Sequence, residues 1–285
     1  MDLTNIKTIK DIAVRFGFVF KKGLGQNFLT DYSVLEETVD AAEIENGVLE
    51  IGPGFGVLTD ALARTGKKVV SVEVDERLLP VLEYTLADYD NVKVINRDIL
   101  KTDITALISE EFSNTPISIA ANLPYYITTP IITALLEARL PVNNMVFMVQ
   151  KEVAERIAAK KGRDAGAISL FCQYFAEPEY IMTVPAASFY PPPKVDSAVL
   201  RLKMLDKPRV LVKDEKLLFQ VIRASFAQRR KTLANGLSSG LGMEKADINA
   251  ILNECGFSET VRGEALTLED FAVISDKIYD VKRGA

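Results

Sequence analysis

Short apolar runs alternate with helical patterns over the first 150 residues. The runs are four to six residues long and occupy 48–51, 68–73, 92–95, 117–120 and 145–149. Between most of them, apolar residues recur at helical spacing, for example in 57–65, 77–87 and 129–138. Strand and helix in alternation predict a parallel sheet with helices on both faces, whose ligands bind at the carboxyl ends of the strands.

The pattern changes after about residue 210. Apolar residues then recur at helical spacing without a strand-like run, first at Leu217, Leu218, Val221, Ile222 and Phe226, then near 244–254 and 267–281. This change predicts a small helical domain at the end of the chain. With the boundary at Leu205–Pro208, we expect an α/β domain over 1–206 and an all-helical domain over 207–285.

Composition places the chain among ordinary globular proteins. It has 285 residues, of which 48% are hydrophobic and 26% charged. The first residues show no basic-then-apolar signal, and no apolar run approaches the length of a membrane span. We therefore expect a cytoplasmic protein without a membrane association.

The counts of histidine and cysteine exclude several kinds of chemistry. There is no histidine, and Cys172 and Cys255 stand apart without a CxxC pair. A Ser-His-Asp hydrolase, a Cys-His protease and a histidine-ligated metal site are excluded, and no metal is predicted. The remaining chemistry depends on positioning more than on proton transfer by imidazole.

Charge is distributed unevenly along the chain, although its net value is −5. Residues 1–22 carry five Lys or Arg and two acids, and residues 194–231 carry eleven and four. These two segments together hold +10, so the remainder holds −15. The basic segments fit a nucleic-acid contact, but a solvated face without a partner fits them as well.

The first apolar run ends in a glycine-rich turn, Glu50-Ile51-Gly52-Pro53-Gly54-Phe55-Gly56. Glycines at alternate positions allow a tight turn and a close approach of the backbone to a ligand, just before a helix N-terminus. Glu73 closes the second run, where its carboxylate can accept both hydroxyls of a ribose. The two features predict an adenosine cofactor. They leave open a nicotinamide or flavin nucleotide, and a glycine turn that binds no ligand.

Two features favour S-adenosylmethionine over a dinucleotide. The turn has the acid-x-Gly-x-Gly-x-Gly form that is typical of methyltransferases, and the third run is followed by Asn96-Arg97-Asp98. Asp98 can accept the amino hydrogens of adenine, although an aspartate in this place also serves as the cap of the next turn. The glycine turn, Glu73 and Asp98 in this order therefore predict an S-adenosylmethionine site more specifically than any one of them does.

The fourth run ends in the segment Ala121-Asn122-Leu123-Pro124-Tyr125-Tyr126-Ile127-Thr128. Methylation of an exocyclic adenine nitrogen needs acceptors for the amino hydrogens, because the nitrogen lone pair is delocalised into the ring. The Asn122 amide oxygen and the Leu123 carbonyl can accept them, and Pro124 restricts the geometry of that carbonyl. Tyr125 offers a flat face for a flipped base. The alternative is a proline turn with both tyrosines packed on the sheet.

Further motifs extend the pattern over nearly the whole chain. They are Leu24-Gly25-Gln26-Asn27-Phe28-Leu29, Val72-Glu73-Val74-Asp75, Gln150–Arg156, Phe189–Ser197 and Phe226–Leu233. Through these motifs and their order, the chain resembles the small-subunit (16S) ribosomal RNA adenine-N6,N6 dimethyltransferases of the KsgA/RsmA type. The resemblance implies a Rossmann-like class I S-adenosylmethionine-dependent methyltransferase domain over 1–206 and a smaller all-helical domain for rRNA recognition over 207–285.

The resemblance also implies roles for individual residues. Those implied to bind or border the cofactor are Asn27, Leu29, Gly52, Gly54, Glu73, Asp98 and Asn122. Those implied at the target base are Asn122, Leu123, Pro124, Tyr125 and Phe189, with the two rings on either side of the base. Those implied to contact rRNA are Lys194, Arg229, Arg230 and Lys231. Phe189 also fits a core aromatic beside a proline-rich turn.

The predicted activity is the transfer of methyl groups from S-adenosylmethionine to N6 of two adjacent adenines in the 3′-terminal hairpin of small-subunit rRNA. The expected partner is small-subunit rRNA within the pre-30S particle, and the expected state is a monomer. Three alternatives remain: a large-subunit rRNA adenine methyltransferase of the macrolide-resistance type, a ribosome-assembly factor that acts mainly by binding, and a nicotinamide-dependent oxidoreductase.

Overall fold

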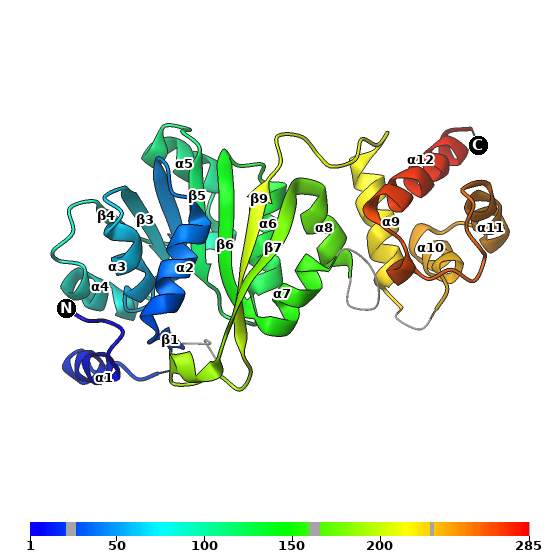
Figure 1. Ribbon diagram of the computed structural model, residues 1–285. Helices are drawn as coiled ribbons and strands as arrows, with labels where there is room; N and C mark the ends of the chain where they lie inside the picture. The colour runs from blue at the N-terminus through cyan, green and yellow to red at the C-terminus, as the bar shows by residue number, and fades with distance from the viewer. Residues whose placement is uncertain (21–26, 160–165, 229–230, 285) are drawn as a thin grey trace. The chain divides into compact units, whose positions relative to one another are not determined.

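The computed structural model describes residues 1–20, 27–159, 166–228 and 231–284 (Figure 1). Contacts divide the chain into two compact units, one of Met1–Ala154 with Pro178–Met204 and one of Glu155–Glu177 with Leu205–Ala285. The break after Met204 lies close to the sequence-based boundary. The segment 155–177 differs, because the boundary at 206 leaves it in the first domain whereas its contacts are with the C-terminal helices.

A seven-stranded sheet in the order β4-β3-β2-β5-β6-β9-β7 forms the centre of the first unit. Its strands are β2 (Gly47–Ile51), β3 (Lys68–Glu73), β4 (Val92–Asn96), β5 (Ile117–Asn122), β6 (Val142–Gln150), β7 (Ala176–Val184) and β9 (Ser197–Met204). The pairs from β4 to β6 are parallel, and β9 is antiparallel to β6. The five strands predicted from apolar runs are β2 to β6, and the α/β fold class is confirmed.

The sequence did not predict β7 and β9. β7 is an edge strand that carries Glu177, Pro178 and Glu179, and most of its residues are half-buried or exposed. Edge strands tolerate proline and charge because one side of their backbone remains unpaired. In β9 the apolar run is interrupted by Arg201, which pairs with Glu43 at 2.7 Å. Neither strand therefore shows the continuous apolar run of a central parallel strand.

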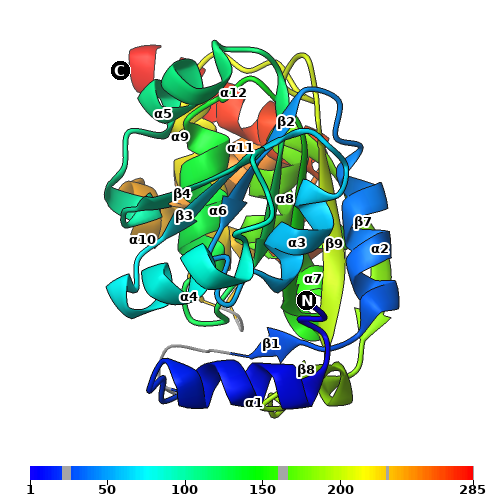
Figure 2. The same cartoon turned by 90° about the vertical axis from the view of Figure 1, so that its left-hand side faces the viewer.

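Helices cover both faces of the sheet. Figure 2 shows α2 (Tyr32–Ala42) and α3 (Val57–Ala63) on one face and α5 (Ile104–Phe112) and α6 (Thr128–Glu137) on the other. Asp31 and Asp103 begin two of these helices, since their carboxylates accept hydrogen bonds from the amides of Ser33 (3.2 Å) and Ala106 (2.9 Å). The other elements of this region are α1 (Ile6–Arg15), η2 (Glu76–Leu78), α4 (Leu79–Thr85), η3 (Ile99–Lys101), α7 (Lys151–Ala158) and η4 (Ala186–Ser188).

The N-terminal segment packs on the glycine turn through aromatic rings. The Phe28 and Phe55 ring centroids are 4.3 Å apart, and Phe20 contacts both rings. Phe28 belongs to β1 (Phe28–Leu29), which pairs antiparallel with β8 (Phe189–Tyr190). This cluster brings residues before 30 and near 190 to the end of β2, where they complete the site described below.

The second unit contains helices in its described part. They are α8 (Ala167–Phe175), α9 (Glu215–Phe226), α10 (Leu233–Leu241), α11 (Lys245–Glu254), η5 (Gly263–Ala265) and α12 (Leu268–Gly284). Phe171 and Phe175 of α8 pack on Phe219 of α9, with ring centroids 4.9 and 5.9 Å apart. The sequence predicted α9, α11 and α12. It did not predict α10, which contains two glycines.

The two glycines of α10 allow close packing against α9. A Cβ atom on Gly236 would lie 2.7 Å from the carbonyl oxygen of Ala224, and one on Gly240 would lie 2.4 Å from the Ala224 Cβ. Glycine lowers helix propensity, so a sequence pattern argues against a helix here although packing favours it. Among the described helices of both units, none combines the length and apolar composition that crossing a membrane requires.

Candidate active site

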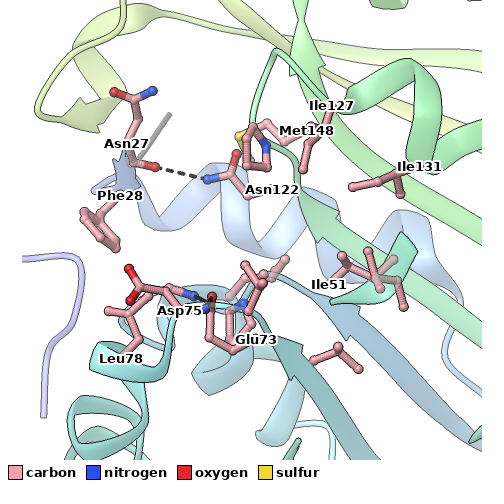
Figure 3. A pocket seen from close by; sticks show the side chains of 18 of the residues that line it. Asn27, Phe28, Ile51, Glu73, Asp75, Leu78, Asn122, Ile127, Ile131 and Met148 are labelled. Carbon is pink, nitrogen blue, oxygen red and sulfur yellow. Dashed lines mark hydrogen bonds between the residues drawn. The ribbon is translucent and has the colours of Figure 1, made fainter. Parts of the chain in front are cut away.

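A cavity lies at the carboxyl ends of β2, β3, β4 and β5 (Figure 3). The strands that follow β2 in sequence, β3 and β4, lie on one side of it, whereas β5 and β6 lie on the other side. Parallel sheets bind ligands where the strand order reverses in this way. Of the predicted site residues, Asn27, Leu29, Gly52, Gly54, Glu73, Asp98, Asn122 and Pro124 line this cavity. They come from five separate parts of the sequence.

The glycine turn places main chain, without side chains, along one wall of the cavity. Gly52, Gly54 and Gly56 have φ values of +71°, +60° and +84°, which other residues adopt only at a cost. A Cβ on Gly54 would lie 2.9 Å from the Phe28 ring, whereas one on Gly52 would meet no atom within 4 Å. Gly52 thus leaves open space beside the turn, where a ligand can approach the backbone.

Glu73 lies across the cavity from Asn122 (Figure 3). Its carboxylate accepts hydrogen bonds from the Asp75 amide at 2.8 Å and the Gly54 amide at 3.3 Å. The side chain is nearly buried, and this burial raises its pKa against the opposing effect of the two amides. The carboxylate is therefore held at the end of β3 with its oxygens directed at the glycine turn and the cavity.

Glu50 supports the turn from inside the protein, just before Gly52. It is 1% exposed, and its Oε2 accepts hydrogen bonds from Ser71 Oγ (2.6 Å) and Thr59 Oγ1 (2.7 Å). Its Oε1 has no partner in the described part of the chain. Burial raises the pKa of Glu50 to about 7, and the nearby charge of Glu73 adds to the rise. The side chain links β2, β3 and α3 at the base of the cavity.

Asp98 caps the next turn and also lies at the cavity. Its Oδ1 accepts a hydrogen bond from the Leu100 amide at 3.0 Å, so it caps η3, and it also lines the cavity. Its Oδ2 lies 3.3 Å from the ammonium group of Lys101, whose side chain is 83% exposed. An exposed pair of this kind is weak, so Asp98 retains acceptor capacity towards the cavity.

Asn122 ends β5 and is oriented by a residue far away in the sequence. Its Nδ2 donates a hydrogen bond to the Asn27 carbonyl oxygen at 3.2 Å, drawn as a dashed line in Figure 3. The amide nitrogen is thereby engaged, and Oδ1 is the atom that can accept from a ligand. This orientation suits an acceptor for an amino group.

The residues after Asn122 occupy different environments. Leu123 is 1% exposed and donates its amide to the Met148 carbonyl at 3.1 Å, while Pro124 lines the cavity. Tyr125 is half-buried, and its hydroxyl lies 2.7 Å from Ser197 Oγ. Tyr126 is 60% exposed and lines the cavity, so it is not packed on the sheet as the alternative for this segment requires. Leu123 and Tyr125 are not among the lining residues.

Phe189 lies in the core cluster of the first unit. It is 3% exposed, it pairs with Leu29 through β1 and β8, and it is not among the residues that line the cavity. The burial agrees with the core aromatic that the sequence also allowed. Leu29, which does line the cavity, is its direct neighbour.

Two of the four predicted rRNA contacts can be placed. Lys194 is exposed in the proline-rich loop, and Lys231 is exposed before α10. Arg229 and Arg230 lie outside the described residues, as do Leu24, Gly25 and Gln26 of the N-terminal motif.

Sequence reasoning missed several lining residues. They include Pro53, Val74, Asp75, Arg97, Leu100 and Met148. Most of them are immediate neighbours of residues that were predicted. Extending each strand-end motif by two residues would have found all of them except Met148, which comes from the neighbouring strand β6.

Comparisons with known proteins agree with this architecture. The family model described as "Ribosomal RNA adenine dimethylase" matches residues 17–276. The curated protein "Ribosomal RNA small subunit methyltransferase A" of Geobacillus sp. (strain WCH70) is 51% identical over 98% of this chain and 99% of its own. Its counterpart from Bacillus mycoides (strain KBAB4) is 51% identical over 97% of both chains.

Two solved structures share the fold. A dimethyladenosine transferase from Plasmodium falciparum is 25% identical with a TM-score of 0.72, covering 90% of this chain and 98% of its own. The 23S rRNA methyltransferase ErmE is 25% identical with a TM-score of 0.70, covering 89% and 100%. With a family model and close relatives that both span nearly the whole sequence, the chain belongs to the ribosomal RNA adenine dimethylase family.

Proposed function

We propose that this protein transfers methyl groups from S-adenosylmethionine to N6 of two adjacent adenines in the 3′-terminal hairpin of small-subunit rRNA, giving N6,N6-dimethyladenosine. The observation that carries the proposal is the orientation of Asn122, whose Oδ1 is left as an acceptor in the cavity that Glu73 and Asp98 also line. Relatives of nearly the same length that are 51% identical bear the name of a small-subunit rRNA methyltransferase.

The cavity fits S-adenosylmethionine, which supplies an electrophilic methyl group on a sulfonium. The open space beside Gly52 allows a ligand to lie against the main chain, and Asn27 and Leu29 line the same cavity. The Glu73 carboxylate would accept the ribose hydroxyls, exchanging its long bond to the Gly54 amide for a hydroxyl donor. Asp98 would accept from the adenine amino group.

The target amino group would meet its acceptors at the end of β5. Asn122 Oδ1 and the Leu123 carbonyl would accept the two N6 hydrogens, which moves electron density onto the nitrogen that is methylated. Pro124 limits the conformations of that carbonyl. Tyr125 would stack on one face of the base and Phe189 on the other. Neither ring lines the cavity and Phe189 is 3% exposed, so this arrangement requires both rings to become accessible when the base binds. A general base is not required, because the proton can leave after the methyl group has been transferred.

The helical domain would hold the ribosomal substrate. Lys231 is exposed in this domain, and Arg229 and Arg230 directly precede it in the sequence. Lys194, the fourth basic residue, is exposed in the first unit. We assign catalysis to 1–206 and rRNA recognition to 207–285, in a monomer that acts in the cytoplasm on the pre-30S particle. The basic residues would bind phosphates, so their contribution should weaken with salt.

A second candidate is a large-subunit rRNA adenine methyltransferase, favoured by the likeness to ErmE. Identity to that enzyme is 25%, against 51% to the small-subunit methyltransferases, which favours the small subunit. A role as an assembly factor can coexist with catalysis.

The test is incubation of the protein with labelled S-adenosylmethionine and purified ribosomal subunits that lack these marks. We expect label in dimethyladenosine of the small subunit and none in the large subunit. Label in the large subunit alone would support the second candidate. If neither subunit is labelled but the protein restores small-subunit maturation, the assembly role stands and the enzymatic proposal fails.

A further inference from the structure

Ser197 occupies a buried position next to the proposed target-base site. It begins β9, it is fully buried (0% exposed), and its Oγ lies 2.7 Å from the Tyr125 hydroxyl. The two residues are 72 positions apart in the sequence. The reaction as proposed above does not use the serine hydroxyl.

Ser197 also closes the loop that carries Phe189. The loop starts at Ala186, whose amide donates a hydrogen bond to Asp196 Oδ1 at 2.9 Å. The Asp196 carbonyl in turn accepts from the Lys151 amide at 3.0 Å, which attaches the end of the loop to the residue after β6. The loop therefore returns to its own beginning one residue before Ser197.

The Phe189 side of this loop is attached to the N-terminal segment. The Ser188 carbonyl accepts hydrogen bonds from the Thr30 amide at 2.8 Å and the Thr30 hydroxyl at 3.0 Å. Phe189 then pairs with Leu29, which lines the cavity. Phe189 is thus held by main-chain contacts, whereas Tyr125 depends on its own side chain for its orientation.

A hydrogen bond at the far end of a tyrosine ring restricts the rotation of that ring. Tyr125 is half-buried in the segment between β5 and α6, and its hydroxyl meets a serine on a strand of the central sheet. Burial raises the pKa of Tyr125, so the phenol stays neutral at physiological pH and can donate or accept. The contact therefore persists over the pH range in which the enzyme would act.

We propose that Ser197 is a positioning residue that holds the Tyr125 hydroxyl and so sets the plane of the Tyr125 ring relative to Phe189. This inference rests on the proposed function, in which the two rings stack on the target adenine. It joins two motifs of the sequence, the Asn-Leu-Pro-Tyr end of β5 and the proline-rich loop that ends in Ser197. A ring that can tilt would still bind the base but would align N6 less often with the acceptors.

The test compares Ser197→Ala, Tyr125→Phe and the double variant in the methylation of unmodified small subunits. Each single variant should lower kcat about fivefold to tenfold, as expected for one lost hydrogen bond. The double variant should be no slower than either single one, because both remove the same contact. Affinity for S-adenosylmethionine, measured by calorimetry, should change less than about twofold in all three.

A matched control exists in the same unit. Tyr180 is a half-buried residue of β7, and its hydroxyl lies 2.7 Å from Oγ1 of the exposed Thr183. Tyr180→Phe should retain wild-type kcat. Tyr125→Ala, which removes the stacking face, should be slower than Tyr125→Phe.

Three results would overturn the inference. One is wild-type kcat in both single variants while Tyr125→Ala is inactive, which leaves the proposed function intact. Another is an additive loss in the double variant, and a third is an equal loss of cofactor affinity and kcat, which would indicate a general structural defect. A wild-type protein that methylates neither subunit would overturn the proposed function itself, and this inference with it.

Discussion

The proposed site has two sides, one for the cofactor and one for the target base, and they are built by different means. The cofactor side consists of Gly52, Glu73 and Asp98, which follow the neighbouring parallel strands β2, β3 and β4. The target side consists of Asn122 to Tyr125 with the Phe189 loop, joined by side-chain contacts over 72 and 95 positions of sequence. The main chain of the sheet therefore fixes the cofactor side, and a few polar side chains fix the target side.

The two sides also differ in charge. Glu50 and Glu73 on the cofactor side are buried carboxyls whose pKa values are raised. The target side presents an amide, a carbonyl and a phenol. Because these groups stay neutral near pH 7, we expect pH to act mainly through the cofactor side. A single side-chain change should act more strongly on the target side, where no repeated backbone pattern compensates for it.

The largest effect is expected for Asn122→Ala. Removing the acceptor for the amino group should lower the rate of methyl transfer by about two to three orders of magnitude, as for other lost transition-state hydrogen bonds. Affinity for S-adenosylmethionine should fall far less, because Gly52, Glu73 and Asp98 remain. Calorimetry and single-turnover methylation of small subunits measure the two quantities.

Asn143→Ala is the control for that change, since Asn143 is an exposed residue of β6 in the same unit. It should leave both quantities unchanged. If Asn122→Ala lost cofactor affinity as strongly as rate, the separation of the two sides would be wrong.

The next effect concerns stability and pH. The Glu50 pKa is about 7 in the folded protein, against 4.5 for a free side chain, so folding favours its protonated form. Its contribution to the free energy of unfolding is present below about pH 4.5 and is lost as the pH rises to about 7. The wild type should lose about 3 kcal/mol of its free energy of unfolding over this pH range, and Glu50→Gln, which cannot ionise, should not.

Urea unfolding of both proteins at pH 5 and pH 8 checks this prediction, and the advantage of the variant should grow with pH. Glu111 serves as the opposite case, because hydrogen bonds from Lys93 and Lys68 lower its pKa. Glu111→Gln should lose stability relative to the wild type as the pH rises above the acid range. The same pH trend in both variants would argue against burial as the cause.

Gly52→Ala should affect the cofactor side through the backbone. Gly52 and Gly66 have φ values of +71° and +72°, and a Cβ on either would meet no atom within 4 Å. Alanine should therefore cost both positions a similar amount, about 1 kcal/mol of stability. Affinity for S-adenosylmethionine should fall at least about tenfold in Gly52→Ala but not in Gly66→Ala, because only the alanine methyl group at position 52 would enter the cavity. Equal affinity in the two variants would mean that no ligand approaches Gly52.

The smallest effect is expected for Lys101→Ala. Its ammonium pairs with Asp98 at 3.3 Å, but the side chain is 83% exposed and the pair is screened by water. Cofactor affinity should change less than about twofold at moderate salt. A larger loss in a binding titration would show that Lys101 itself holds Asp98 in place.

Individual elements show how much of the secondary structure could be predicted from the sequence. Strands β2, β3, β5 and β6 were predicted because central strands are buried on both faces and read as apolar runs. The edge strand β4 is only half-buried, and it was predicted from Val92, Val94 and Ile95. The edge strand β7 and the glycine-containing helix α10 were not predicted, because the local composition of each argues against it. Both form because of their packing against neighbouring elements. The segment 155–177 was grouped with the first domain, although its aromatic residues pack on α9.

The site shows the same division. Gly52, Glu73, Asp98 and Asn122 could be named from the sequence because each follows a strand, and the ends of parallel strands converge at one edge of a sheet. The exposed Tyr126, the buried Phe189 and the support from Glu50 could not be named in this way. Their surroundings come from residues far away in the chain.

The sequence by itself determined the order of strands β2 to β6 and of most helices between them, the residues at the strand ends and the family to which the chain is related. The tertiary structure decided which way the Asn122 amide faces, how deeply Phe189 is buried and that Ser197 meets Tyr125. The physical reason is the sequence separation over which each kind of interaction acts. Periodicity and turn chemistry act over a few residues and leave a mark in the local sequence. A hydrogen bond from a side chain to a residue 72 or 95 positions away forms only after folding has brought the two residues together.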